Sequence, residues 1–444
     1  MTFTPEILRR KLDELVATAP AARRYIVAFS GGLDSTVLLH ALAACTEREL
    51  DAVLAVHVDH GLHTDSASWA AHCEAFAAGL GVDYAMRQVT VDRSAEGGLE
   101  AAARHARYAA LRSFIEPGDW LLSGHHQDDQ AETLLLNLMR ASGPAGLAGI
   151  APVRRFAAGW LVRPLLDTPR DDLEAYAESL GLDYVEDPSN LDQLFDRNYL
   201  RHEILPRLEQ RWPDAAGRIR RSSELARDAA GLLAQRAAED CDRLGDRSDR
   251  LSIAGLTALS PARQRNVLRH AIGELGLPVP GAARIESILS DLLTARPDAQ
   301  PLVAWPGGEA RRYRDRLYLL PASAGRIGPD RQAVEGLHMP LEHGLGALVF
   351  EPGSDYGLSD ALVEDGLEVR YRVGGEEIRP YGQRHTKKLK KLLQESGVVP
   401  WMRERLPLVY SSGRLVAVAD LWLADDAAAA PGTAVRWQNR PAID

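Results

Sequence analysis

The chain has 444 residues, a formal net charge of −10 and 45% apolar residues, which are ordinary values for a folded protein of two to four domains. No stretch of about 18 apolar residues occurs and the first residues lack a secretory signal pattern, so we expect no membrane span and no membrane partner. The three cysteines, Cys45, Cys73 and Cys241, are scattered, which predicts a cytoplasmic protein without a disulfide framework or a cysteine zinc site.

Short apolar runs alternate with helical patterns over roughly the first 125 residues. The first two runs are apolar almost throughout, as in parallel strands buried on both faces. This alternation predicts an α/β fold with a doubly wound, mostly parallel sheet, whose ligands bind at the carboxyl ends of the strands. The expected strands cover 25–29, 52–58, 82–91 and 119–123, and the expected helices cover 36–44, 66–80 and 99–115.

The first expected strand leads into Ser30–Ser35, which reads Ser-Gly-Gly-Leu-Asp-Ser, and then into an apolar helix. Gly31 and Gly32 allow a sharp turn and a close approach to an anion, and the N–H groups of the following helical turn favour negative charge. A glycine-rich turn with a Ser/Asp cap is the plainer interpretation. The strand before and the helix after favour a phosphate site, and the segment resembles the pyrophosphate loop of the ATP pyrophosphatases, with neither a Walker A ending nor a dinucleotide fingerprint.

Two further clusters follow expected strands. Three histidines lie within His57–His63, which fits a nucleotide or substrate pocket. The segment 124–133 reads GHHQDDQAET and opens a helix on which Asp129 and Glu132, three residues apart, share a face. Two such carboxylates can hold an ammonium ion or a metal. Acids that complement a helix dipole would explain the carboxylates but not the adjacent histidines.

Basic residues are concentrated at three places. Arg104 and Arg107 are spaced i, i+3, and Arg197 and Arg201 are spaced i, i+4; each pair could contact phosphate or simply form a solvated helix face. Four of the five lysines occur together on a helix expected at 386–396, and the longer stretch from Arg379 to Arg405 holds eight Lys/Arg but only two Glu. This concentration favours contact with an RNA backbone over a solvated face. The lysines are Lys387, Lys388, Lys390 and Lys391.

The composition changes along the chain predict three domains. Residues 1–212 hold the alternating pattern, residues 213–330 are mainly helical with a terminal hairpin near 301–320, and residues 331–444 combine short strands with the lysine-rich helix in a small α+β domain.

Taken in order, the motifs resemble the tRNA(Ile)-lysidine synthetase family of the PP-loop ATP pyrophosphatases. The matching segments are SGGLDS, HVDHGLH, EAAARHARY, GHHQDDQAET, EDPSN and RNYLRHEILP, and later KKLKKLL and the segment from Val399-Pro400-Trp401 to Pro407. Ala141-Ser142-Gly143 departs mildly from the expected Gly-Ser/Thr-Gly. The resemblance covers nearly the whole chain and implies an adenine nucleotide alpha-hydrolase-like fold in the first domain.

The resemblance also implies a cytoplasmic ligase in which free L-lysine, ATP and tRNA(Ile) with a CAU anticodon give lysidine, AMP and pyrophosphate. Attachment of AMP to the 2-oxo group of the wobble cytidine makes that oxygen a good leaving group for attack by the lysine ε-amine. Catalysis is assigned to Asp34, Asp129 and Glu132, of which Asp34 positions Mg²⁺ and the other two hold the lysine ammonium and take its proton. ATP would be bound by Ser30, Gly31, Gly32, Leu33, Asp34, Ser35 and His57.

The same resemblance implies that the two later domains bind tRNA. Contacts to tRNA or phosphate are expected from Arg104, Arg107, Arg197 and Arg201, and from Lys387, Lys388, Lys390 and Lys391. A homodimer is left open. Two other interpretations also remain open at this stage. One is another PP-loop tRNA-modifying enzyme such as a thiolase, which needs paired or clustered cysteines, whereas the three cysteines here are scattered. The other is a non-catalytic tRNA-binding protein, against which the intact Ser30–Ser35 segment argues.

Overall fold

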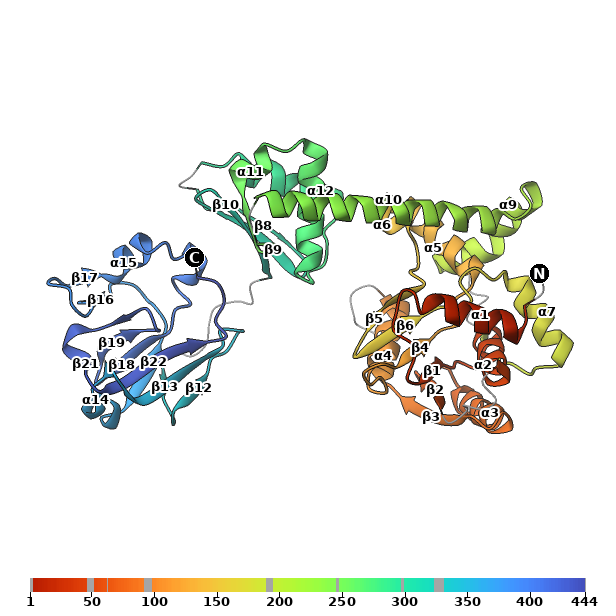
Figure 1. Ribbon diagram of the computed structural model, residues 1–444, viewed down its shortest axis with the longest axis horizontal. Helices are drawn as coiled ribbons and strands as arrows, with labels where there is room; N and C mark the ends of the chain where they lie inside the picture. The colour runs from red at the N-terminus through yellow and green to blue at the C-terminus, as the bar shows by residue number, and fades with distance from the viewer. Residues whose placement is uncertain are drawn as a thin grey trace. The chain divides into compact units, whose positions relative to one another are not determined.

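The computed structural model describes residues 3–45, 52–61, 63–91, 98–188, 195–244, 247–296, 299–322 and 331–443 (Figure 1). The chain divides into two compact units, Met1–Leu233 and Ala234–Asp444. Among the described residues, no helix combines the length and the apolar character that crossing a bilayer requires.

A six-stranded sheet forms the centre of the first unit, in the order β3-β2-β1-β4-β6-β5. All neighbouring strands run parallel except β5, which pairs antiparallel with β6 at one edge. In the register of the central strands, Val27 lies opposite Ala55 and Leu122. The strands are β1 (Tyr25–Ala28), β2 (Val53–Asp59), β3 (Asp83–Gln88), β4 (Trp120–Leu122), β5 (Val153–Phe156) and β6 (Gly159–Val162).

Helices cover both faces of this sheet, because neighbouring residues of a strand point to opposite sides. Val27 packs in a large core with helices α1, α2, α3 and α7, whereas Ile26 packs in a smaller core with α4. The sheet is therefore buried on both faces, which explains the continuous apolar runs. These helices are α1 (Pro5–Leu15), α2 (Leu33–Cys45), α3 (Ser66–Gly79), α4 (Gly98–Arg112) and α7 (Arg170–Leu180).

A further group of helices packs around Ala131 and Leu205 rather than on the sheet. It contains α5, which follows β4 and carries the acidic motif, and the segment around Arg197. The members are α5 (Gln127–Met139), α6 (Pro144–Leu147), α8 (Asp196–Tyr199), the π-helical turn η3 (Leu200–Ile204), α9 (Leu205–Arg211) and the 30-residue α10 (Ala215–Leu244), inside which the two units divide.

The second unit begins with a four-stranded antiparallel sheet, in the order β7-β10-β9-β8, whose core is shared with short helices. The expected hairpin at 301–320 is thus part of a larger sheet. Its elements are β7 (Arg250–Ser252), α11 (Ile253–Thr257), α12 (Pro261–Glu274), α13 (Ala282–Ser287), η4 (Ile288–Leu292), β8 (Leu302–Trp305), β9 (Gly308–Tyr313) and β10 (Arg316–Pro321).

The rest of the second unit consists mainly of antiparallel strands around one large core. Two five-stranded sheets run in the orders β11-β15-β18-β19-β20 and β12-β13-β22-β14-β21. The first contains β11 (Gln332–Ala333), β15 (Leu367–Arg370), β18 (Leu408–Ser411), β19 (Arg414–Val418) and β20 (Trp422–Leu423). The second contains β12 (His338–Pro340), β13 (Ala347–Ser354), β14 (Gly357–Leu358), β21 (Ala428–Ala429) and β22 (Gly432–Gln438).

The lysine-rich segment is a short strand followed by a helix. Lys387 and Lys388 form β17 (Lys387–Lys388), which pairs with β16 (Glu377–Ile378), and α15 (Leu389–Glu395) begins only at Leu389. The helix expected at 386–396 is therefore shorter, with Leu389, Leu392 and Leu393 buried. The same part of the second unit also contains α14 (Asp360–Glu364) and the turns η5 (Pro400–Met402) and η6 (Asp425–Ala427).

The predicted fold class is confirmed: a mostly parallel α/β sheet is followed by helices and then by a strand-rich C-terminal part. The predicted domain boundaries after residues 212 and 330 stay predictions.

Candidate active site

The loop Ser30–Ser35 joins the end of β1 to the start of α2, at the carboxyl edge of the sheet. Gly31 has φ +84°, a conformation that favours glycine, and a Cβ atom there would lie 2.8 Å from the Cys73 Sγ atom. The Gly31 carbonyl accepts hydrogen bonds from the Val185 amide at 2.8 Å and the Thr36 hydroxyl at 3.1 Å. The back of the loop is therefore held by three different segments.

The two serine hydroxyls of the loop lie next to each other. Ser30 Oγ and Ser35 Oγ are 3.0 Å apart, and the Ser30 amide donates to Ser35 Oγ at 3.2 Å. Ser30 is exposed, whereas Ser35 is buried and donates to the Gly32 carbonyl. Leu33, by contrast, packs its side chain in the core, so only its backbone is available to a ligand. The exposed edge of the loop offers hydroxyl and backbone donors, the groups that bind phosphate.

Asp34 lies in the first turn of α2, facing the end of β4. Its Oδ1 atom is buried and has no hydrogen-bond partner among the described residues, and its Oδ2 atom is 3.7 Å from His126 Nε2. Burial raises the pKa of Asp34. The approach is close because residue 124 is glycine, where a Cβ atom would lie 3.0 Å from the Asp34 backbone. Asp34 is thus a half-buried carboxylate, 31% exposed, whose Oδ1 atom has no hydrogen-bond partner among the described residues.

His57 lies inside β2, as in the strand expected at 52–58, and β2 continues one residue further to Asp59. The ring is buried, with Nδ1 3.0 Å from the Phe29 carbonyl oxygen and 3.5 Å from Cys73 Sγ. Burial lowers the pKa of His57. The structure therefore places this histidine behind the loop, against the residue that precedes it, and its contact with nucleotide stays a prediction.

His126 caps the N-terminus of α5, where Nδ1 accepts from the Asp128 amide and the Asp129 carboxylate accepts from the His126 amide at 3.0 Å. His126 Nε2 is buried 3.5 Å from Asp129 Oδ2 and has no hydrogen-bond partner among the described residues. This capping box fixes His126 between Asp34 and Asp129. Some of the histidines and acids that the sequence gathers here, namely His126 and Asp129, thus also stabilise the start of α5.

Glu132 is fully buried and paired with two arginines. Arg197 Nε donates to Oε2 at 2.6 Å, and Arg201 donates to both oxygens, from Nε at 2.7 Å and from Nη2 at 3.1 Å. Asp129 Oδ1 is also contacted by both arginines, at 3.3 and 3.4 Å. Arg197 and Arg201 thus organise the acidic motif, and their predicted contact with tRNA or phosphate stays a prediction.

The pKa values of two carboxylates in this cluster are shifted in opposite directions. Burial raises the pKa of Asp128, whereas at Asp129 the interactions with His126 and Arg197 and the hydrogen bond from the His126 amide outweigh burial and hold the pKa below its usual range. Burial lowers the pKa of His125 to about 3, so this ring is neutral. Asp129 is therefore ionised and suited to bind a cation such as an ammonium group.

The donor set fits a magnesium ion that is shared with a substrate. Within the described ranges no three His, Cys, Asp or Glu side chains are grouped so as to enclose a metal. Mg²⁺ is usually held by one or two carboxylates together with substrate phosphates, and Asp34 offers one buried, unpartnered oxygen beside the loop.

The remaining predicted residues belong to other elements than the loop. Arg104 and Arg107 are on α4, and the charge of Arg104 contributes to the low pKa of His125, for which burial is the main cause. The four lysines belong to the second unit. Sequence reasoning missed Gly124, Cys73 and Val185, which shape the loop from segments far along the chain. Only Gly124, next to the two histidines, carried a sequence signal.

Three protein families match parts of this chain: a PP-loop domain over residues 4–208, a TilS substrate binding domain over 251–318 and a TilS substrate C-terminal domain over 367–438. Among curated proteins, a tRNA(Ile)-lysidine synthase of Alkalilimnicola ehrlichii is 44% identical over 99% of this chain and 97% of its own. Proteins of the same name from Xanthomonas campestris pv. campestris and Coxiella burnetii are 42% and 39% identical, over 91% and 94% of this chain and 91% and 92% of their own.

Proposed function

This chain belongs to the tRNA(Ile)-lysidine synthase family, and we propose that it joins free L-lysine to C2 of the wobble cytidine of a tRNA(Ile) with a CAU anticodon, while ATP is converted to AMP and pyrophosphate. The chain is an enzyme that modifies tRNA, with an ATP-binding PP-loop domain. The family assignment favours this activity over thiolation and over binding without catalysis. The observation that carries the proposal is the buried, unpartnered oxygen of Asp34 beside the phosphate-type loop.

In the first step the cytidine 2-oxo oxygen attacks the α-phosphorus of ATP, and pyrophosphate leaves. The loop holds the triphosphate with the backbone N–H groups and hydroxyls of Ser30–Ser35, at the positive end of α2. Such donors need no reorganisation as charge develops in the transition state. Asp34 would hold Mg²⁺, which supplies neutralisation of the charge on the departing pyrophosphate.

In the second step the lysine ε-amine attacks C2, and the C2–O bond to AMP breaks. Only about one amine in 2,500 is neutral at pH 7, so the site must bind the ammonium form and remove a proton. Glu132 is poorly placed for this task because Arg197 and Arg201 donate to both of its oxygens, at 2.6 to 3.1 Å. The same arginines contact Asp129 at one oxygen only, at the longer distances of 3.3 and 3.4 Å. We therefore assign the ammonium contact to the ionised Asp129 and assign Glu132 to positioning the two arginines.

Identification of the reaction product tests this proposal. The full chain is incubated with ATP, L-lysine and an unmodified tRNA(Ile) transcript, and the digested nucleosides are analysed by mass spectrometry. We expect the wobble cytidine to gain one lysine with loss of water, and no such product from a tRNA(Ile) transcript with uridine at the wobble position. A modified nucleoside that forms only with a sulfur donor would support the thiolase alternative instead.

A further inference from the structure

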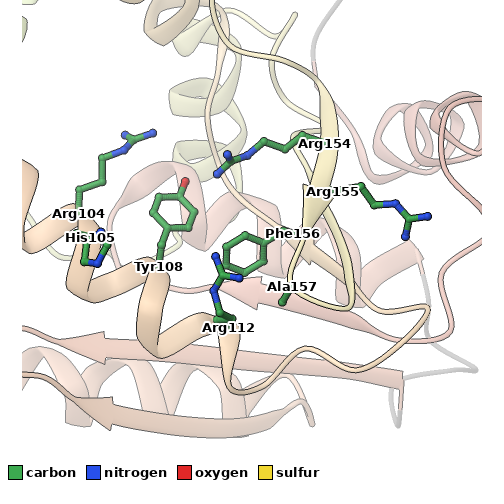
Figure 2. A pocket seen from close by; sticks show the side chains of 8 residues that line it. All are labelled: Arg104, His105, Tyr108, Arg112, Arg154, Arg155, Phe156 and Ala157. Atoms are coloured by element: carbon green, nitrogen blue, oxygen red, sulfur yellow. The ribbon is translucent and has the colours of Figure 1, made fainter. Parts of the chain in front are cut away.

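An arginine-rich pocket lies in the first unit between α4 and the β5–β6 hairpin (Figure 2). Its volume is about 520 Å³. Tyr108 and Phe156 form its aromatic part, with ring centroids 5.7 Å apart in an edge-to-face arrangement. The other lining residues are Arg104, His105, Arg112, Arg154, Arg155 and Ala157, so none of the lining side chains is acidic.

The guanidinium groups of the pocket lie over aromatic rings. Arg104 and Arg154 are 5.4 and 5.7 Å from the centre of the Tyr108 ring, and Arg112 is 5.4 Å from that of Phe156. Figure 2 shows Arg104 and Arg154 reaching toward the hydroxyl end of Tyr108 from opposite sides. Planar cations stacked on rings hold a fixed orientation and keep their N–H edges available.

These arginines carry positive charge that nearby acids do not neutralise. Arg104, Arg112, Arg154 and Arg155 are exposed, and within the described ranges no carboxylate lies at ion-pair distance from any of them. The charges of Arg104, Arg163 and Arg107 also outweigh burial and lower the pKa of Tyr108. A chain of net charge −10 that gathers unpaired arginines in one place has a site suited to an anionic ligand.

The form of the pocket favours a nucleic acid strand over a small anion. A phosphate ion alone is usually held by a compact set of backbone N–H groups, whereas these cations are spread over a helix and a hairpin. Aromatic rings and arginine planes together are the surfaces on which unstacked RNA bases stack, and exposed arginines bind the adjoining phosphates.

The pocket is also within electrostatic reach of the candidate active site. Arg104 lines the pocket, and its charge, with that of Arg163, adds to the burial that lowers the pKa of His125 at the start of the acidic motif. If the reacting base of an RNA lies at the carboxyl ends of the β-strands, the neighbouring nucleotides would therefore lie near this pocket.

We propose that this pocket binds a second, unstacked nucleotide of the single-stranded loop that contains the reacting cytidine. Its base stacks against Tyr108 and its guanidinium neighbours, and Arg112, Arg154 and Arg155 contact the flanking phosphates. This inference rests on the proposed function, since it takes the anticodon loop of tRNA as the ligand. It adds a site for RNA that is separate from the ATP loop.

The test compares Arg154→Ala/Arg155→Ala in the full chain with Arg9→Ala/Arg10→Ala, a control that removes two arginines from α1. Binding to an anticodon stem-loop RNA is measured over a range of salt concentrations. We expect the pocket variant to bind about tenfold more weakly at low salt and to lose about 1–2 units of the log Kd–log salt slope, in line with two lost phosphate contacts. The KM for ATP should not change.

A second arm tests base stacking. With 2-aminopurine placed in turn at each loop position, the wild type should change the fluorescence at one position, Tyr108→Phe should keep that change, and Tyr108→Ala should lose it. The inference is overturned if the pocket variant binds like the control variant, or if no loop position responds. Lysidine formation by the wild type separates this outcome from failure of the proposed function, which would appear as no product at all.

Discussion

Arg201 binds both carboxylate oxygens of Glu132, across 69 residues of sequence, with Nε 2.7 Å from Oε1 and Nη2 3.1 Å from Oε2. Glu132 is completely buried, and Arg197 donates to it as well. The pair joins the acidic motif of α5 to the π-helical turn η3, so the position of Asp129 depends on it.

Replacement of Glu132 should therefore destabilise the protein rather than only impair catalysis. Glu132→Ala leaves two arginines without their main partner, and we expect a loss of about 3 kcal/mol in the free energy of unfolding, near the lower end for a broken buried pair because the arginines are partly exposed. The free energy of unfolding is measured by urea denaturation, followed by a spectroscopic signal from the first unit. Glu174→Ala, which breaks the more accessible pair with Arg170, whose side chains are 34% and 42% exposed, should cost about 0–1 kcal/mol. Equal losses in the two variants would contradict the positioning role of Glu132.

Asp34 should show the opposite behaviour. Because burial raises its pKa, the ionised carboxylate is unfavourable in the folded protein, and Asp34→Asn should keep or increase thermal stability. The same variant should lower AMP formation by about 10²-fold or more, as expected for loss of a charge-stabilising group. Melting temperature and AMP release are measured on one preparation. Full turnover by Asp34→Asn or Asp34→Ala would refute the role given to this residue.

Gly31 and Gly32 provide a matched pair for the loop. Gly31→Ala places a Cβ atom 2.8 Å from Cys73 Sγ at a φ of +84°, and we expect it to cost about 1–3 kcal/mol of stability without nucleotide. Gly32→Ala meets nothing closer than Ser30 Oγ at 3.6 Å, so the free protein should remain nearly as stable as the wild type. Chemical denaturation of both variants decides this, and equal stabilities would mean that the loop does not require glycine at position 31.

The lysine-rich segment separates into paired and unpaired cations. Lys387 and Lys391 lie 3.7 and 3.9 Å from the Glu395 carboxylate, whereas in the described part of the chain no acid pairs with Lys388 or Lys390. If this segment binds RNA phosphate, Lys388→Ala/Lys390→Ala should weaken tRNA binding more than Lys387→Ala/Lys391→Ala, with about 0.7–0.9 lost from the salt slope per contact. Glu395→Ala should strengthen binding. Identical affinities in all three variants would exclude the segment from the RNA interface.

Much of the first unit could be predicted from the sequence because its signals are local. Continuous apolar runs marked β1, β2 and β4, and polar residues after them marked the edge of the sheet where the loop and Asp129 lie. The strand expected at 52–58 contains His57, as β2 does, but nothing local showed that its buried ring nitrogen would be hydrogen bonded with the Phe29 carbonyl.

The partners of the site residues could not be predicted, because they depend on contacts between distant segments. The spacing of Arg197 and Arg201 indicated a basic helix face, but nothing local showed that this face would be directed at Glu132. Similarly, Arg154 and Arg155 carried no signal of their own until the β5–β6 hairpin placed them beside Tyr108. The sequence pattern therefore shows which residue types a helix face carries, whereas the residues that this face contacts are known only from the fold.

In the proposed reaction, the Ser30–Ser35 loop positions ATP for cleavage between the α and β phosphates. The most direct measurement follows ATP labelled at the α-phosphate in the presence of the full chain, unmodified tRNA(Ile) and L-lysine, and resolves the labelled products. We expect labelled AMP, formed together with pyrophosphate in amounts equal to the lysine joined to tRNA, and no labelled AMP when tRNA is left out. Labelled ADP as the product, or lysine joined to tRNA without AMP, would contradict the proposed reaction.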